Sequence, residues 1–276
     1  MKLSANHKLQ LTALSIFVLS FSQPLLAYAG EANQLRQGLS KNLIEFIFNR
    51  NSEEESANDG SDSERPRRRP TGRTPGADRD DCPATALPLT ALIPVYDDHD
   101  DYDEPPLTIS EHPTFWFYIP HQPEEIVAGE FVYTNQNGEQ LYRGFFELEN
   151  TPGIVNITIP PESGTSLSVD HDYRWVFKLL CNPRDPSSYV FLEGDIKRVD
   201  IEEELMTELN SQEDEDYIVY ARHGIWHDAL TSLGSRLRAD ETEEVIQDNW
   251  RKILEDHDLG HLTDEPVLEC CTPEQL

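Results

Sequence analysis

Residues 110–120 read S-E-H-P-T-F-W-F-Y-I-P, the densest run of aromatic and β-branched side chains in the chain. The five residues from Phe115 to Ile119 are typical of a β-strand. Pro113 and Pro120 bound the run and disfavour a helix through it. Consecutive side chains of a strand point to opposite sides, so five apolar residues in a row predict a strand that is buried on both faces.

The residues around this run repeat a pattern of short strands separated by turns. Asn137-Gly138 lies between the apolar runs 129–134 and 141–148, which is a strong signal for a hairpin. Further strands are predicted at 89–95, 154–159, 173–181 and 189–199. About seven strands of this size indicate an antiparallel β-sandwich, immunoglobulin-like in size, over residues 82–200. A barrel is the alternative.

Residues 201–276 change to helical periodicity and make the predicted fold class α+β. Two apolar stripes at helical spacing are joined near residues 239–241, which predicts a helical hairpin packed on the sandwich. The stripes consist of Ile225, Trp226, Ala229, Leu230, Leu233 and Leu237, and of Val245, Ile246, Trp250, Ile253 and Leu254.

The first 29 residues have the three parts of a secretory signal peptide. Lys2 and Lys8 precede an apolar run, and Ala27-Tyr28-Ala29 fits the cleavage rule. The apolar run is shorter than the roughly 20 residues that a membrane helix needs. We therefore expect a periplasmic or secreted protein without stable membrane insertion after cleavage. A retained, uncleaved anchor is the alternative.

Residues 30–50 have the spacing of a short amphipathic helix, and residues 51–81 have the composition of a disordered linker. The linker contains no apolar residue larger than alanine. Its basic segment, Arg65 to Arg73, includes Arg67, Arg68 and Arg69. This segment is either a solvated linker or a tether to an anionic envelope polymer or to the acidic surface of the protein itself.

The charge balance restricts the class of partner. With 52 acidic against 22 basic residues, the formal net charge is −30. Such a surface repels nucleic acid and anionic lipid, so another envelope protein or a glycan is the expected partner. Residues 97–104, D-D-H-D-D-Y-D-E, lack the glycine and the bidentate glutamate of an EF-hand loop. A solvated insert is therefore favoured over a calcium site, and no cofactor is predicted.

Four cysteines, in an oxidising compartment, predict two disulfides with three possible connectivities. A bond between Cys270 and Cys271 would close a strained eight-membered ring. We therefore expect Cys82 and Cys181 each to pair with one cysteine of the C-terminal pair. Metal binding by Cys270 and Cys271 is disfavoured because no C-x-x-C spacing is present.

No motif identifies an enzyme. There is no G-x-S-x-G sequence, and His223 and His227, although four residues apart, lack the glutamate of H-E-x-x-H that would mark a zinc site. Tryptophan and tyrosine side chains can stack on glycans, but within strands they more often belong to the core. The aromatic candidates are Trp116, Trp175, Tyr118 and Tyr142.

The sequence favours a non-enzymatic binding module of the cell envelope. A hydrolase acting on envelope polysaccharide or peptide, and a glycan-binding module, are the alternatives. The candidate interaction surface consists of Glu111, His112, Trp116, Arg67, Arg68 and Arg69.

Five tracts, over roughly residues 82–276, resemble a cyanobacterial family of exported proteins of unknown function, DUF928. The resemblance implies export from a cyanobacterial cell, and it supplies no activity and no catalytic residue. The acidic insert after Val95 looks longer than in such relatives, which argues against a shared role for it. The tracts are S-E-H-P-T-F-W-F-Y-I-P, P-G-I-V-N-I-T-I-P from Pro152, L-L-C-N-P-R-D from Leu179, G-I-W-H-D-A-L from Gly224 and E-P-V-L-E-C-C from Glu265.

Overall fold

The structure is a computed structural model, which describes residues 73–74, 82–94, 105–185, 187–211, 214–240 and 242–271. All of them belong to one compact unit, Gly38–Leu276. The predicted signal peptide, the predicted helix at 30–50, most of the linker with Arg67, Arg68 and Arg69, and the acidic run 97–104 lie outside the described residues.

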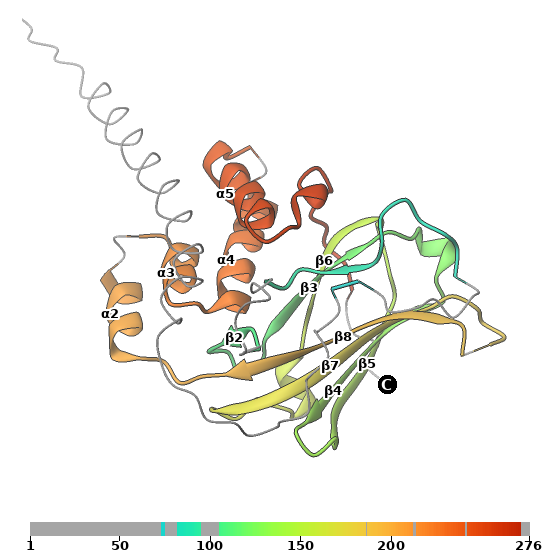
Figure 1. Ribbon diagram of the computed structural model, residues 1–276, viewed down its shortest axis with the longest axis horizontal. Helices are drawn as coiled ribbons and strands as arrows, with labels where there is room; N and C mark the ends of the chain where they lie inside the picture. Colours follow the sequence, from blue (N-terminus) through green and yellow to red (C-terminus); the bar gives the residue numbers. More distant parts are fainter. Residues whose placement is uncertain are drawn as a thin grey trace, which may run out of the picture. The chain divides into compact units, whose positions relative to one another are not determined.

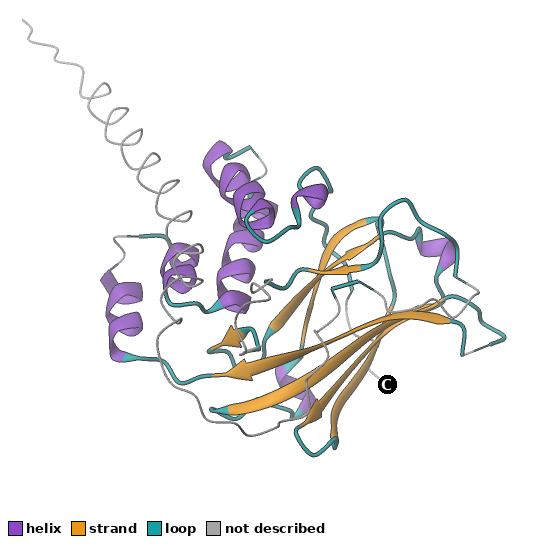
Figure 2. Ribbon diagram, viewed as in Figure 1, coloured by secondary structure: helices purple, strands orange, loops and turns teal. Residues whose placement is uncertain are grey.

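The strands of the described ranges form two sheets (Figures 1 and 2). The three-stranded sheet has the order β1-β3-β6, with β1 at Thr90–Ala91, β3 at Thr114–Ile119 and β6 at Gly153–Thr158. The five-stranded sheet has the order β2-β8-β7-β4-β5, with β2 at Leu107–Thr108, β8 at Tyr189–Arg198, β7 at His171–Leu180, β4 at Ala128–Asn135 and β5 at Gln140–Phe146. All pairs are antiparallel except β2–β8, which is parallel. The fold is α+β as predicted, but an antiparallel sandwich of seven strands is not confirmed.

Strand β3 is buried on both faces, as its sequence predicts. Phe115 and Phe117 pack against the five-stranded sheet, with ring centroids 4.8 Å from Phe131 and 4.5 Å from Phe177, respectively. Trp116 and Tyr118 point the other way, into a second core that the helices share. The three-stranded sheet is therefore a middle layer between the five-stranded sheet and the helices (Figure 1).

Four α-helices follow the last strand in the described part of the chain. The two predicted helices correspond to α4 and α5, while the sequence reading did not separate α2 and α3. None of these helices has the length and apolarity needed to cross a bilayer. The helices are α2 (Glu203–Ser211), α3 (Asp216–Arg222), α4 (Trp226–Ala239) and α5 (Glu244–Glu255), and short 3-10 turns occur at η1 (Pro123–Glu125), η2 (Pro161–Ser163) and η3 (Gly260–Leu262).

Segments from both ends of the described chain cover the edges of the three-stranded sheet. Ala91 N donates a hydrogen bond to Arg73 O at 2.9 Å, and Arg73 Nε donates to Ile93 O at 3.0 Å. On the other edge, Ile154 N donates to Pro266 O at 2.8 Å. Arg73, which the sequence analysis assigns to the linker, therefore has hydrogen-bond partners in the folded unit for both its backbone and its guanidinium.

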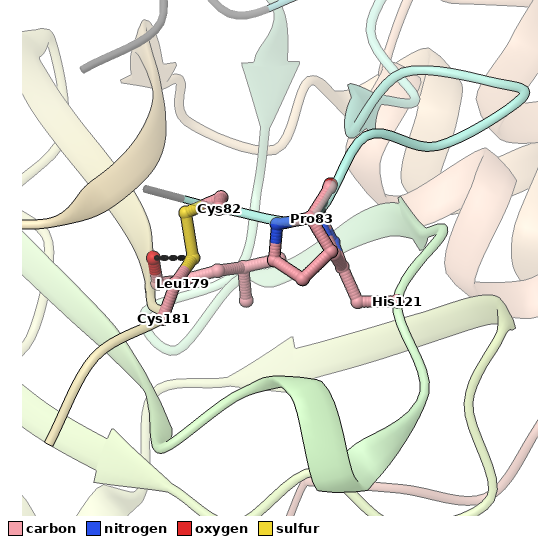
Figure 3. The surroundings of a disulfide bond; sticks show 5 residues. All are labelled: Cys82, Pro83, His121, Leu179 and Cys181. Atoms are coloured by element: carbon pink, nitrogen blue, oxygen red, sulfur yellow. Dashed lines mark hydrogen bonds between the residues drawn. A yellow bond between two sulfur atoms is a disulfide. The ribbon is translucent and has the colours of Figure 1, made fainter. Parts of the chain in front are cut away.

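One disulfide joins Cys82 to Cys181 (Figure 3). The other joins Cys270 to Cys271, so the predicted pairing is wrong. The fold brings Cys82 beside Cys181, at the end of β7, with 5.2 Å between their Cα atoms despite a sequence separation of 99. This leaves Cys270 and Cys271 to each other, and Cys271 adopts a φ of 72°.

Candidate functional site

The segment that connects β2 to β3 is the polar junction of the fold. It contains Glu111 and His112, which the sequence singles out, and it lies where the five-stranded sheet, the three-stranded sheet and α4 meet. We refer to residues 108–114, with Arg198, His227 and Asp228, as the β2–β3 junction.

The first turn of α4 holds this segment from one side. Asp228 Oδ2 accepts hydrogen bonds from Thr108 Oγ1 at 2.7 Å and from Ile109 N at 3.2 Å. His227 Nδ1 lies 3.2 Å from the carbonyl oxygen of Thr114. The tract from Ser110 and the tract from Gly224 therefore contact each other directly, although they are more than a hundred residues apart in the sequence.

Arg198, at the end of β8, holds the same segment from the other side. Its guanidinium donates to Leu167 O at 2.6 Å and to Ile109 O at 3.3 Å, and its Nη2 forms an ion pair with Glu111 Oε1 at 3.1 Å. The Glu111 side chain nevertheless remains exposed. Glu111, one of the predicted surface residues, thus contacts both solvent and the junction.

His112 is fixed mainly through its backbone. Its N–H donates to Ser110 Oγ at 3.1 Å, and its half-buried ring has no hydrogen-bond partner for Nδ1 within the described ranges. The described residues thus place His112 in the β2–β3 junction through its backbone rather than through its ring.

Burial changes the protonation behaviour of both α4 residues. It lowers the pKa of His227 to about 4, against a weaker opposing effect from the hydrogen bond to Thr114. It raises the pKa of Asp228, and the bonds from Thr108 and Ile109 oppose that rise. A general acid or base must reach its substrate, and His227 is only 4% exposed. The two side chains are placed to connect elements of the fold.

The predicted histidine pair is not brought together. His223 ends α3, Gly224 follows with a φ of 69°, and His227 belongs to α4, so the two histidines are not on one helix. His223 lies near Glu208, whereas His227 lies against Thr114. No group of three or more metal-ligating side chains occurs among the residues that the structure describes.

The aromatic candidates for a glycan surface lie mostly in the core. Trp116 is 2% exposed, and its Nε1 donates to Thr231 Oγ1 at 3.1 Å beneath α4. Trp175 and Tyr118 are also buried, and Tyr142 is half-buried at the core margin. The prediction of Trp116 as part of an interaction surface is therefore wrong, because α4 covers its ring.

The outer face of the five-stranded sheet, which is turned away from the three-stranded sheet, carries side chains that the sequence reading did not single out. The strand register places Phe145, Glu130, Lys178 and Phe191 side by side in one row across β5, β4, β7 and β8. We define the outer apolar patch as six half-exposed side chains that belong to none of the core clusters: Val132, Phe145, Val176, Leu180, Tyr189 and Phe191.

Ion pairs lie across this patch. Glu130 is buried at its centre, with a side chain that is 4% exposed, and it binds Arg143 from β5 and Lys178 from β7. The same two cations lie over the rings of Phe145 and Tyr189. A buried carboxylate without partners would destabilise the fold, so Glu130 requires these two ion pairs. The pairs in turn hold both basic side chains in position. The row becomes apparent only once the pairing of β4 with β7 and of β7 with β8 is known.

Comparison with known proteins gives one family and no function. A family model described as Domain of Unknown Function (DUF928) matches residues 74–267. No curated protein and no solved structure matches the chain.

Proposed function

The chain belongs to the DUF928 family, and from that premise we propose that it is a non-enzymatic module of the cell envelope that binds another envelope protein. Export is supported by the signal-like residues 1–29 and by the disulfide between Cys82 and Cys181. Disulfides of this kind persist in oxidising compartments. In this proposal the two sheets act as a β-sandwich-like scaffold, and the partner binds to the outer face of the five-stranded sheet.

The observation that carries the proposal is the outer apolar patch. Apolar side chains that a folded unit leaves half-exposed on one face, interspersed with polar groups, commonly mark a protein interface. Phe145, Phe191 and Tyr189 supply the aromatic anchors that such interfaces favour.

The charge of this face supports the same conclusion. Four basic and four acidic side chains point outward from the sheet, so their sum is zero in a chain of net charge −30. A partner protein of acidic net charge that approaches here meets less repulsion than over the rest of an acidic surface. The eight side chains are Arg143, Arg174, Lys178 and Lys197, and Glu130, Asp172, Glu193 and Asp195.

Site-specific photo-crosslinking in cells tests the proposal. A photo-reactive residue at Phe191 is expected to capture a reproducible protein partner that mass spectrometry identifies. The same residue at Met206, an exposed position on α2, is the matched control. Capture of no reproducible protein at Phe191, or of the same proteins at both positions, would count against the outer face as the binding surface.

A further inference from the structure

Strand β5 is the long free edge of the described sheets. In the three-stranded sheet, Arg73 covers the edge at β1, and the segment around Pro266 covers the edge at β6. In the five-stranded sheet, the edge strand β2 has two residues, whereas β5 extends over the seven residues Gln140–Phe146.

No described strand pairs with β5 on the side that faces away from β4. For the chain segments that the structure describes, the hydrogen bond to this strand from outside β4 runs from Thr165 Oγ1 to Leu141 O, at 2.9 Å. The unpaired N–H and C=O groups of an edge strand form a template for a further strand. The geometry of β5 therefore fits an extended polypeptide segment.

The charges around β5 indicate which segment fits best. The strand itself contains no acidic residue, and its one cation, Arg143, is paired with Glu130. Exposed carboxylates lie at both ends, with Glu139 before the strand and Glu147 and Glu149 after it. A second copy of the chain would bring these carboxylates close to their own kind, whereas basic side chains would pair with them.

We propose that β5 binds an extended polypeptide segment of a partner protein, which adds to the sheet as a sixth strand and carries basic residues at both ends. Strand addition of this kind obtains affinity from the main chain and specificity from side chains. The basic residues at the two ends of the segment should be about 27 Å apart, because the eight residues from Glu139 to Glu147 span about that distance in a strand. This inference rests on the proposed binding function and names the partner chemistry at the edge of the same sheet.

A synthetic peptide tests the proposal on the full chain. Its sequence is Lys-Lys-Val-Thr-Val-Thr-Val-Thr-Lys-Lys, and the analogue with glutamate in place of lysine serves as the peptide control. We expect the lysine peptide to bind in fluorescence anisotropy and to slow amide hydrogen exchange in residues 140–146. We expect the glutamate analogue to bind at least about tenfold more weakly, because its ends would repel the acidic flanks of β5.

Charge reversal on the protein locates the site. The double variant Glu147→Lys/Glu149→Lys is expected to weaken binding of the lysine peptide about tenfold. The double variant Glu203→Lys/Glu204→Lys on α2 makes the same change in net charge and is expected to alter binding less than about twofold. Absence of binding, equal effects of the two variants, or protection outside β5 would overturn the strand-addition proposal.

The two proposals fail separately. If Phe191 captures a partner while the peptide does not bind at β5, the outer face remains the binding surface and strand addition is wrong. If the peptide protects β5 while Phe191 captures no protein, the edge rather than the face is the site.

Discussion

Asp228 connects the helical layer directly to the five-stranded sheet: its Oδ2 atom on α4 accepts a hydrogen bond from Thr108 Oγ1 on β2, at 2.7 Å. Strand β2 belongs to the five-stranded sheet, while α4 packs on the opposite side of β3. The same oxygen accepts from Ile109 N. The carboxylate therefore fixes the position at which the chain passes from β2 into the middle layer.

Replacing Asp228 by alanine should destabilise the protein. The change leaves Thr108 Oγ1 and Ile109 N without this acceptor, which typically costs about 1 to 3 kcal/mol of unfolding free energy. Asp228→Asn keeps an acceptor oxygen at the position and should cost less. Urea unfolding measures both, with Glu204→Ala on the exposed side of α2 as the control. Equal losses of unfolding free energy for Asp228→Ala and Glu204→Ala would show that the hydrogen bonds of Asp228 do not stabilise the fold.

His227 should make stability fall as the solution is acidified. Its pKa is about 4 in the folded protein, against an ordinary value of 6.5, because burial disfavours the charged ring. Between these values the unfolded chain binds a proton that the folded chain does not, so the stabilisation present above pH 6.5 is lost as the pH falls to 4. The full loss is about 3 kcal/mol.

The variant His227→Asn separates this effect from other titrations. The amide of asparagine takes the position of Nδ1 and can still donate to Thr114 O, but it does not titrate. The unfolding free energy of this variant should therefore vary less between pH 6.5 and 4 than that of the wild type. Asp228, whose raised pKa acts in the opposite direction with pH, is present in both proteins. Parallel pH profiles for the two proteins would show that His227 does not carry the acid sensitivity.

Gly234 in α4 should not tolerate alanine, although alanine favours helices by about 1 kcal/mol. A Cβ atom at this position would lie 2.5 Å from the nearest atom of the Trp116 ring. The ring is buried and cannot move freely, so Gly234→Ala should reduce the unfolding free energy by about 1 to 3 kcal/mol. Ser235→Ala, at the exposed neighbouring position, should be neutral or stabilising. Thermal unfolding of the two variants measures the difference. A Gly234→Ala variant as stable as Ser235→Ala would show that helix propensity outweighs the contact with Trp116.

The middle layer could be predicted because its signal is local. Five apolar residues between two prolines require burial on both sides, and Phe115 and Trp116 do contact different cores. The stripes of α4 and α5 are equally local, since a helix repeats its apolar face within a few residues. Elements of this kind depend only on residues that are near in the sequence.

The β2–β3 junction could be predicted only in part, because its partners are distant in sequence. Glu111 and His112 stand out as polar residues that lead into a buried strand, but nothing near them indicates Arg198 or Asp228. Strand β2 has two residues and no periodicity, so its parallel pairing with β8 has no sequence signal.

The outer apolar patch was missed for a different reason. Val176 and Leu180 are apolar like the inward residues of β7, so alternation in that strand does not distinguish the two faces. Only the row formed with β4 and β8 shows that these residues share a surface with Glu130 and Phe191.

The two disulfides should contribute unequally to the unfolding free energy, because they close loops of very different length. Cys82 and Cys181 are separated by 99 residues, and a loop of that size is worth about 4 to 5 kcal/mol in the chain-entropy model. Cys270 and Cys271 are neighbours, so their bond restricts little of the unfolded chain. Replacing Cys82 and Cys181 by serine should therefore cost several times more unfolding free energy than replacing Cys270 and Cys271.

Proteolysis without reduction, followed by mass spectrometry, checks the pairing: a peptide linking Cys82 or Cys181 to the C-terminal pair would contradict it. Similar losses in the two double variants would show that loop length does not govern their stability.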